Sequence, residues 1–217
     1  MIAFTVLISF FPTQFSLGQE LKGTLTKTQA NQVVIKCKSD CATICRKTLA
    51  YVNERGTQYA SVSQAIQDCL QVCEMSKDLT RPGSKLHCTA NQLCIDACYQ
   101  CIAACEAIND KKLKNCINAC RTLAIELSYD QLNQLTRDID TLIGLHQKWK
   151  LTNSTKSQEL KARLAKIEEE QQSLRATSSP SLEAYKKLVD EAASFKFELK
   201  RELQSSVGGT NLTGPLP

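Results

Sequence analysis

Residues 94–105 read Cys-Ile-Asp-Ala-Cys-Tyr-Gln-Cys-Ile-Ala-Ala-Cys, a C-x3-C-x2-C-x3-C segment. Its cysteines follow one another at intervals of four, three and four residues, which is the repeat of one face of an α-helix. Thiols therefore stand where leucines would usually form the buried stripe of an amphipathic helix. The segment predicts a helix whose inward face is a row of thiols.

The other cysteines largely repeat the four-residue step. All 12 cysteines of the 217-residue chain lie between residues 37 and 120, and only Cys88 stands outside a C-x3-C pair or triple. Outside the first segment, the paired cysteines are Cys37, Cys41, Cys45, Cys69, Cys73, Cys116 and Cys120. This clustering predicts a cysteine-rich domain over residues 19–128.

Composition and turn signals predict an all-α fold. Hydrophobic residues make up 42% of the chain and charged residues 23%, with only 8 Gly and 5 Pro, and helical periodicity dominates. Turn residues near 55–56, 80–83 and 109–110 divide the cysteine-rich region into four amphipathic segments with short connections. We expect an antiparallel four-helix bundle with inward-facing cysteines.

The charge pattern and the polar residues argue against two classes of function. The formal charge of +5 is spread among acidic residues without a basic stripe, so nucleic-acid binding is not expected. No Ser-His-Asp set or Gly-rich phosphate loop is recognisable, and the two histidines, His87 and His146, fall in different halves of the chain. We therefore do not expect an enzyme.

The N-terminus has the pattern of a secretory signal peptide. Residues 2–11 are apolar, Pro12 ends the run, and Ser16 and Gly18 place small residues before a cleavage site ahead of Gln19. The run is too short for a transmembrane helix, and no other segment could span a membrane. The sequence predicts a signal peptide over residues 1–18 and an exported protein, either periplasmic or secreted.

The chain changes character beyond residue 128. Residues 129–206 carry apolar positions at alternating steps of three and four with charged flanks, which predicts coiled-coil helices, and residues 207–217 are expected to be a disordered tail. Leu132, Leu135, Ile139, Leu142, His146, Trp149, Leu160, Leu164, Ile167, Gln171, Leu174, Tyr185, Val189, Ala192 and Leu199 occupy the predicted face. This face could close within the chain as a hairpin, or it could bind a second copy or a partner helix.

Helix geometry leaves two explanations for the thiol rows. Cβ atoms at positions i and i+4 lie roughly 5–6 Å apart, whereas a disulfide needs about 3.5–4.5 Å. A C-x3-C pair therefore cannot close on itself, but it can hold a soft metal ion or form disulfides to a neighbouring helix. The even number of cysteines and an oxidising compartment would suit a disulfide-stapled helical scaffold that acts through its coiled coil. Cys101, Cys105, Cys116 and Cys120 have the spacing of such a stapled hairpin.

Among soft metals, Cu(I) suits the spacing best. Zinc knuckles and iron–sulfur clusters favour loop cysteines with C-x2-C runs, whereas Cu(I) accepts two or three thiolates and tolerates neighbouring sites. A role with another metal bound by the same thiols is a further alternative. The candidate ligands are Cys37, Cys41, Cys45, Cys69, Cys73, Cys94, Cys98, Cys101, Cys105, Cys116 and Cys120, with Cys88 and His87 as further candidates at the end of the third row.

Residues 37–127 resemble the cysteine-rich four-helix-bundle copper storage proteins. The matching pieces are Cys41-x3-Cys45-Arg-Lys-Thr-Leu-Ala-Tyr, Gln-Asp-Cys69-Leu-Gln-Val-Cys73, Gly-Ser-x2-His87, Leu-Cys94-Ile-Asp-Ala-Cys98-x2-Cys101-x3-Cys105-Glu and Leu-Lys-x-Cys116-Ile-x-Ala-Cys120-Arg. The resemblance implies that inward thiols bind many Cu(I) ions, for storage or buffering without catalysis. Val52, Asn91, Leu123 and Leu127 depart from the family's thiol rows, which implies a lower copper capacity.

Overall fold

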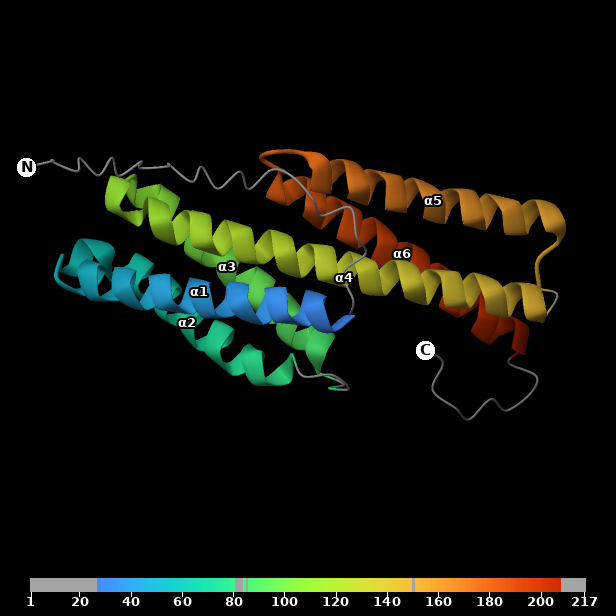
Figure 1. Cartoon of the computed structure of the whole chain (residues 1–217), viewed down its shortest axis with the longest axis horizontal. Helices are drawn as coiled ribbons and strands as arrows, with labels where there is room; N and C mark the ends of the chain where they lie inside the picture. The colour runs from blue at the N-terminus through green and yellow to red at the C-terminus, as the bar shows by residue number, and fades with distance from the viewer. Residues whose placement is uncertain (1–26, 81–83, 85, 150, 208–217) are drawn as a thin grey trace, which may run out of the picture.

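The structure is a computed structural model that describes residues 27–80, 84, 86–149 and 151–207 (Figure 1). Within these ranges the chain forms six α-helices and two short 3-10 turns, without a strand. The helices are α1 (Lys27–Asn53), α2 (Ala60–Leu79), α3 (His87–Ile108), α4 (Lys114–Lys148), α5 (Ser154–Ala176) and α6 (Leu182–Val207). The prediction of an all-α fold is confirmed.

Helices α1 to α4 close into a ring. Helix α1 packs against α2 and α4, and α3 packs against the same two neighbours. Within the ring, helices that follow one another in the sequence run in opposite directions (Figure 1). At the α3–α4 turn, Asn109 adopts a left-handed conformation with φ 53°, which ends α3. The side chain of Asp110 then accepts a hydrogen bond from the backbone N–H of Lys112.

Cysteine is the most frequent residue type in the interior of this ring. Ten cysteines are buried there together with aliphatic residues such as Val52, Ile66 and Leu113 at one end and Leu123 and Leu127 on α4. Thiols at steps of three and four take the inward face of each helix, because that spacing keeps side chains on one side of a helix. We call this interior the thiol core.

Helix α4 is longer than the ring needs. Its 35 residues pass without a break through residue 128, where the sequence predicted the end of the cysteine-rich domain. Leu127 is buried in the thiol core, and Leu132, just over one turn later, is buried in a second core. One helix therefore contributes to both parts of the molecule.

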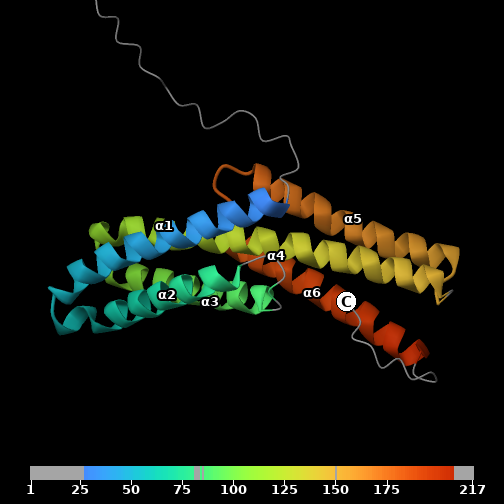
Figure 2. The ribbon, with the colours of Figure 1, turned by 60° about the horizontal axis from the view of Figure 1, so that its bottom comes forward.

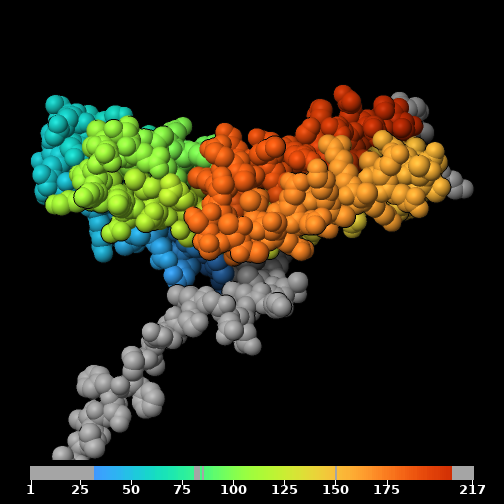
Figure 3. All heavy atoms as spheres, turned by 90° about the horizontal axis from the view of Figure 1, so that it is seen from above, coloured from blue at the N-terminus to red at the C-terminus, as the bar shows by residue number. Residues whose placement is uncertain are grey.

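The second core lies between the later half of α4 and helices α5 and α6 (Figure 2). Most positions of the predicted apolar face are buried in it, whereas Trp149 is exposed. His146 is buried and its Nε2 donates to the carbonyl oxygen of Leu199 at 2.9 Å. The face thus closes within the chain. In Figure 3 the thiol bundle occupies one end of the molecule and α5 and α6 the other.

The predicted signal peptide and disordered tail lie outside the described residues. Among the residues that the structure describes, no helix is long and apolar enough to cross a membrane.

Candidate metal centre

Ten of the predicted ligands converge in the thiol core. Each is at most 1% exposed, and every helix of the ring contributes at least two. They are Cys41 and Cys45 on α1, Cys69 and Cys73 on α2, Cys94, Cys98, Cys101 and Cys105 on α3, and Cys116 and Cys120 on α4.

The sulfurs form a continuous network across the helices. The Sγ atom of Cys120 lies 3.8 Å from Cys41, 4.0 Å from Cys45 and 3.8 Å from Cys69. Further along, Cys116 Sγ lies 3.8 Å from Cys45 and 3.7 Å from Cys101. Single sulfurs therefore touch neighbours on two or three helices at once.

Three sets of four sulfurs are compact enough to hold a metal ion. Within each set, all Sγ atoms lie within 4.8 Å of one another, and all four cysteines are buried. The sets are Cys41/Cys45/Cys69/Cys120, Cys41/Cys69/Cys73/Cys98 and Cys45/Cys101/Cys116/Cys120. They overlap, because the first shares two cysteines with each of the others. The geometry is that of adjoining sites with bridging sulfurs.

This arrangement favours metal binding over a disulfide scaffold. All 12 cysteines are free thiols in the structure. The shortest Sγ–Sγ contacts, 3.7–4.0 Å, are those of non-bonded sulfurs, since a disulfide bond is about 2.05 Å long. A stapled scaffold also needs defined pairs, whereas Cys120 has three neighbours at nearly equal distance.

The buried thiols differ in the direction in which their pKa is shifted. Hydrogen bonding to Cys101 raises the pKa of Cys105 to about 12. The pKa of Cys45 is lowered, because Cys101, Cys116 and Cys120 can donate to its thiolate. Cys73 also has a lowered pKa, with Cys41 the main donor. A metal that binds as a thiolate complex must therefore displace protons from the remaining thiols.

A buried lysine closes one end of the thiol core. Lys38 on α1 is fully buried, and its Nζ donates to the side-chain oxygens of Thr80 at 2.7 Å and Asn91 at 2.9 Å and to the carbonyl oxygen of Ser76 at 3.3 Å. Burial lowers the pKa of Lys38, while the nearby Cys94 and Cys73 raise it. The Oγ of Ser76 in turn lies 2.8 Å from the Sγ of Cys94. The ammonium group thus lies next to Cys94 and Cys73, the thiols at this end of the thiol core.

Lys38 is a site residue that the sequence reasoning missed. The signal was present, because residues 34, 38, 41, 45, 48 and 52 follow steps of four, three, four, three and four. Lys38 therefore shares the inward stripe of Cys41 and Cys45, and Cys37 falls beside it. Cys37 is accordingly only half-buried.

His87 and Cys88 lie at the periphery of this end. His87 Nε2 donates to Asp130 Oδ2 at 2.9 Å, and the same oxygen accepts from Asn91 Nδ2 at 3.1 Å. Asn91, which interrupts the predicted thiol row, thus connects Lys38 to Asp130. Cys88 is exposed on α3. None of the three sulfur sets among the described residues includes Cys37, His87 or Cys88.

Apolar side chains close the opposite end of the thiol core. Val52, Ile66 and Leu113 are each at most 1% exposed there. Outside them, the hydroxyl groups of Tyr51 and Tyr59 both donate to Asp110 Oδ2, at 2.7 and 2.9 Å. These contacts hold the α1–α2 and α3–α4 turns together.

The comparison with known families agrees with this geometry. A sequence model described as copper storage protein matches residues 26–128, which include all 12 cysteines and end just before the second core. No curated protein and no solved structure matches the chain. The resemblance predicted from the cysteine spacing is confirmed for this part of the chain.

Proposed function

We propose that this is an exported protein that stores Cu(I) on the thiolates of its four-helix bundle, because residues 26–128 match the copper storage protein family. The observation that carries the proposal is the overlap of the three sulfur sets, in which Cys41, Cys45, Cys69 and Cys120 are shared. Shared sulfurs allow one thiolate to bridge two metal ions, which a store of many ions in one bundle requires.

The donor set supports Cu(I) as the stored ion. Soft thiolates select Cu(I), zinc or iron–sulfur clusters, and structural zinc normally occupies a separate tetrahedral site. Overlapping sets without other ligands suit an ion that accepts two or three thiolates and tolerates a close neighbour. Burial of every set keeps water and oxidants from the bound ion. The family points to a role without catalysis.

A titration of the reduced protein with Cu(I) against a competing chelator tests storage. We expect several ions per chain, together with the ultraviolet absorption of Cu(I)–thiolate bonds. Cys120→Ser should lower the number of tightly bound ions, because Cys120 belongs to two sets, whereas Cys88→Ser should not. Binding of no more than one ion by the wild type would contradict storage.

Thiol counting separates storage from the alternative of a disulfide scaffold. The protein is isolated without reductant, alkylated and measured by mass. A store of Cu(I) requires alkylatable thiols after the metal is removed, and the absence of any would favour the stapled scaffold. The same mass tests export, since cleavage after Gly18 would leave a chain that begins at Gln19.

A further inference from the structure

Three of the four seams of the ring are tied by polar contacts between helices. The α1–α2 seam has the Arg46–Glu74 ion pair and the contact of Lys38 with Thr80. At the α2–α3 seam, Ser76 Oγ contacts Cys94 Sγ at 2.8 Å. The α3–α4 seam has the Arg121–Glu106 ion pair at 3.0 Å, besides the contacts of Asp130.

The fourth seam, between α1 and α4, is held differently. Among the described residues, its side-chain contacts at hydrogen-bonding distance are all between sulfurs: Cys41–Cys120 at 3.8 Å, Cys45–Cys116 at 3.8 Å and Cys45–Cys120 at 4.0 Å. The apolar side chains of Ile44, Ala119 and Leu123 also lie along this seam, beside polar residues that make no side-chain hydrogen bond across it within the described ranges. The groups that join these two helices are therefore the candidate metal ligands themselves.

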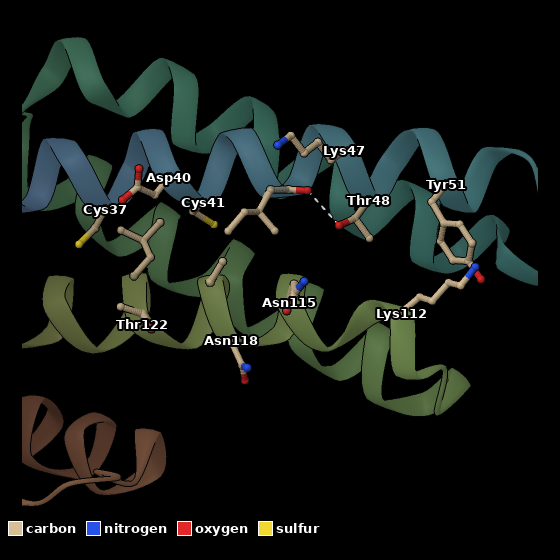
Figure 4. A pocket seen from close by; sticks show the side chains of 13 residues that line it. Cys37, Asp40, Cys41, Lys47, Thr48, Tyr51, Lys112, Asn115, Asn118 and Thr122 are labelled. Atoms are coloured by element: carbon tan, nitrogen blue, oxygen red, sulfur yellow. Dashed lines mark hydrogen bonds between the residues drawn. The ribbon is translucent and has the colours of Figure 1, made fainter. Parts of the chain in front are cut away.

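A groove of about 630 Å³ runs along this seam (Figure 4). Cys37 and Cys41 line one end of it, and Tyr51 and Lys112 line the other. Cys37 is half-buried, whereas Cys41 is 1% exposed and touches Cys120. At the same end of the groove there are thus one partly accessible thiol, Cys37, and one member of the sulfur network, Cys41.

Both ends of the thiol core are obstructed in the described residues. At one end stands Lys38 with its three acceptors. At the other end, the buried side chains of Val52, Ile66 and Leu113 form an apolar layer, and the tyrosine contacts with Asp110 lie outside them. A metal ion passing either end would have to displace a buried cation or cross an apolar layer, and both cost free energy.

We propose that Cu(I) is loaded sideways, through the α1–α4 groove, with Cys37 as the first acceptor and Cys41 as the second. This inference rests on the proposed function and adds the path of the ion and the class of its donor. Lys47 and Lys112 line the groove. Asp40, the one carboxylate among its described lining residues, is paired with Lys36 at 2.7 Å, so the groove favours an anionic donor. We therefore assign the donor as Cu(I) held by a small anionic thiol.

The transfer is a ligand exchange without a redox change. A new bond forms between copper and the Sγ of Cys37, the bond between copper and the donor sulfur breaks, and the proton of the Cys37 thiol leaves with the donor thiolate. Exchange onto Cys41 follows in the same way, with its proton returned to Cys37. Copper then forms a further bond to the Sγ of Cys120, whose thiol proton is released to solvent, and the ion so joins α1 to α4.

Loading kinetics test the proposal. Reduced protein is mixed with the Cu(I) complex of glutathione, and the Cu(I)–thiolate absorption is followed by stopped flow. Cys37→Ser should lose the fast phase of loading while its final copper content stays close to that of the wild type. Cys88→Ser is the matched control, because it removes the other peripheral thiol but not one in the groove, and it should keep the fast phase.

A second pair of variants tests the groove without changing a thiol. Asn115 is exposed, lines the groove and lies between α1 and α4 in Figure 4, so Asn115→Trp should fill the groove and slow loading. Gln100→Trp, at an exposed position of α3 outside the groove, should not. Wild-type rates in both Cys37→Ser and Asn115→Trp would overturn sideways loading, as would faster loading in Lys38→Met. If the wild type binds no Cu(I), the storage function itself fails.

Discussion

At the scale of single residues, the Lys38 ammonium is the group of the thiol core whose burial costs the most folding free energy. Its buried ammonium meets three neutral oxygens rather than a carboxylate. Lys38→Met removes the charge but leaves Asn91 Oδ1 without its donor, and an unpaired buried acceptor costs about 1–3 kcal/mol. We expect the apo variant to lose about that amount of unfolding free energy in urea titrations.

The double variant Lys38→Met/Asn91→Leu separates charge from hydrogen bonding. Leucine at position 91 has no orphaned acceptor, and His87 still pairs with Asp130. The double variant should therefore be more stable than Lys38→Met alone. Lys36→Met, at an exposed position of the same helix, should change stability little, because exposed ion pairs contribute about 0–1 kcal/mol. An equal loss at positions 36 and 38 would contradict the role given to Lys38.

The raised pKa of Cys105 predicts how the stability of the apo protein changes at alkaline pH. Its pKa rises from an ordinary 9.0 to about 12, so folding favours the protonated thiol. The stability that this group contributes is complete below about pH 9 and is lost as the pH rises towards 12. Urea unfolding of wild type and Cys105→Ala across this range should show a steeper loss for the wild type. If the unfolding free energies of the two proteins depended on pH in the same way, folding would not raise the pKa of Cys105.

The stripe that contains Lys38 shows how far single residues can be predicted. The ten buried thiols follow from their steps of three and four, since a helix places such positions on one face. Lys38 and Asn91 obey the same periodicity, but the sequence does not show what would pair with a polar side chain inside the bundle. Only the fold shows that each has a partner there, because Thr80, just after α2, and Asp130, on α4, are distant in the sequence.

At the scale of helices, α4 determines how the two cores are joined. Ser128 and Gln131 have the form of a capping box, but Ser128 is 2% exposed and lies within an unbroken helix. A local capping signal is overridden here because residues on both sides of it are buried, Leu127 in one core and Leu132 in the other. Sequence spacing alone does not show whether the helix ends at Ser128 or continues, since it does not reveal whether the residues on both sides are buried.

Ser128→Pro tests the continuity of α4. Proline removes the backbone N–H that bonds to the carbonyl of Ala124 and clashes with it, which costs about 3 kcal/mol or more in a helix interior. Thermal unfolding of the apo variant should shift to lower temperature and separate into two transitions. Ser128→Ala is the control and should unfold in a single transition near that of the wild type. Matching behaviour of the two variants would show that α4 does not join the cores rigidly.

At the scale of the whole molecule, the division of cysteines predicts where copper acts. Residues 121–217 contain no cysteine, so bound Cu(I) can link only α1, α2, α3 and the first turns of α4. Hydrogen exchange of apo and copper-loaded protein should show added protection in these helices and little change in α5 and α6. Most of the gain should fall on α1 and on residues 114–127, because the side-chain contacts at hydrogen-bonding distance across their seam are between sulfurs.

Two contacts join the thiol bundle to the adjoining ends of α5 and α6, and they could carry some added protection from one to the other. Tyr99 on α3 donates to the carbonyl oxygen of Leu182 at 3.0 Å, and Arg175 pairs with Glu126 at 2.6 Å. A modest gain of protection around residues 175–185 fits transmission through these two contacts. Tyr99→Phe should reduce that gain without altering protection in α1. Equal protection across α5 and α6 would instead mean that copper stabilises the molecule as one unit, and the second core would then be a structural extension of the store.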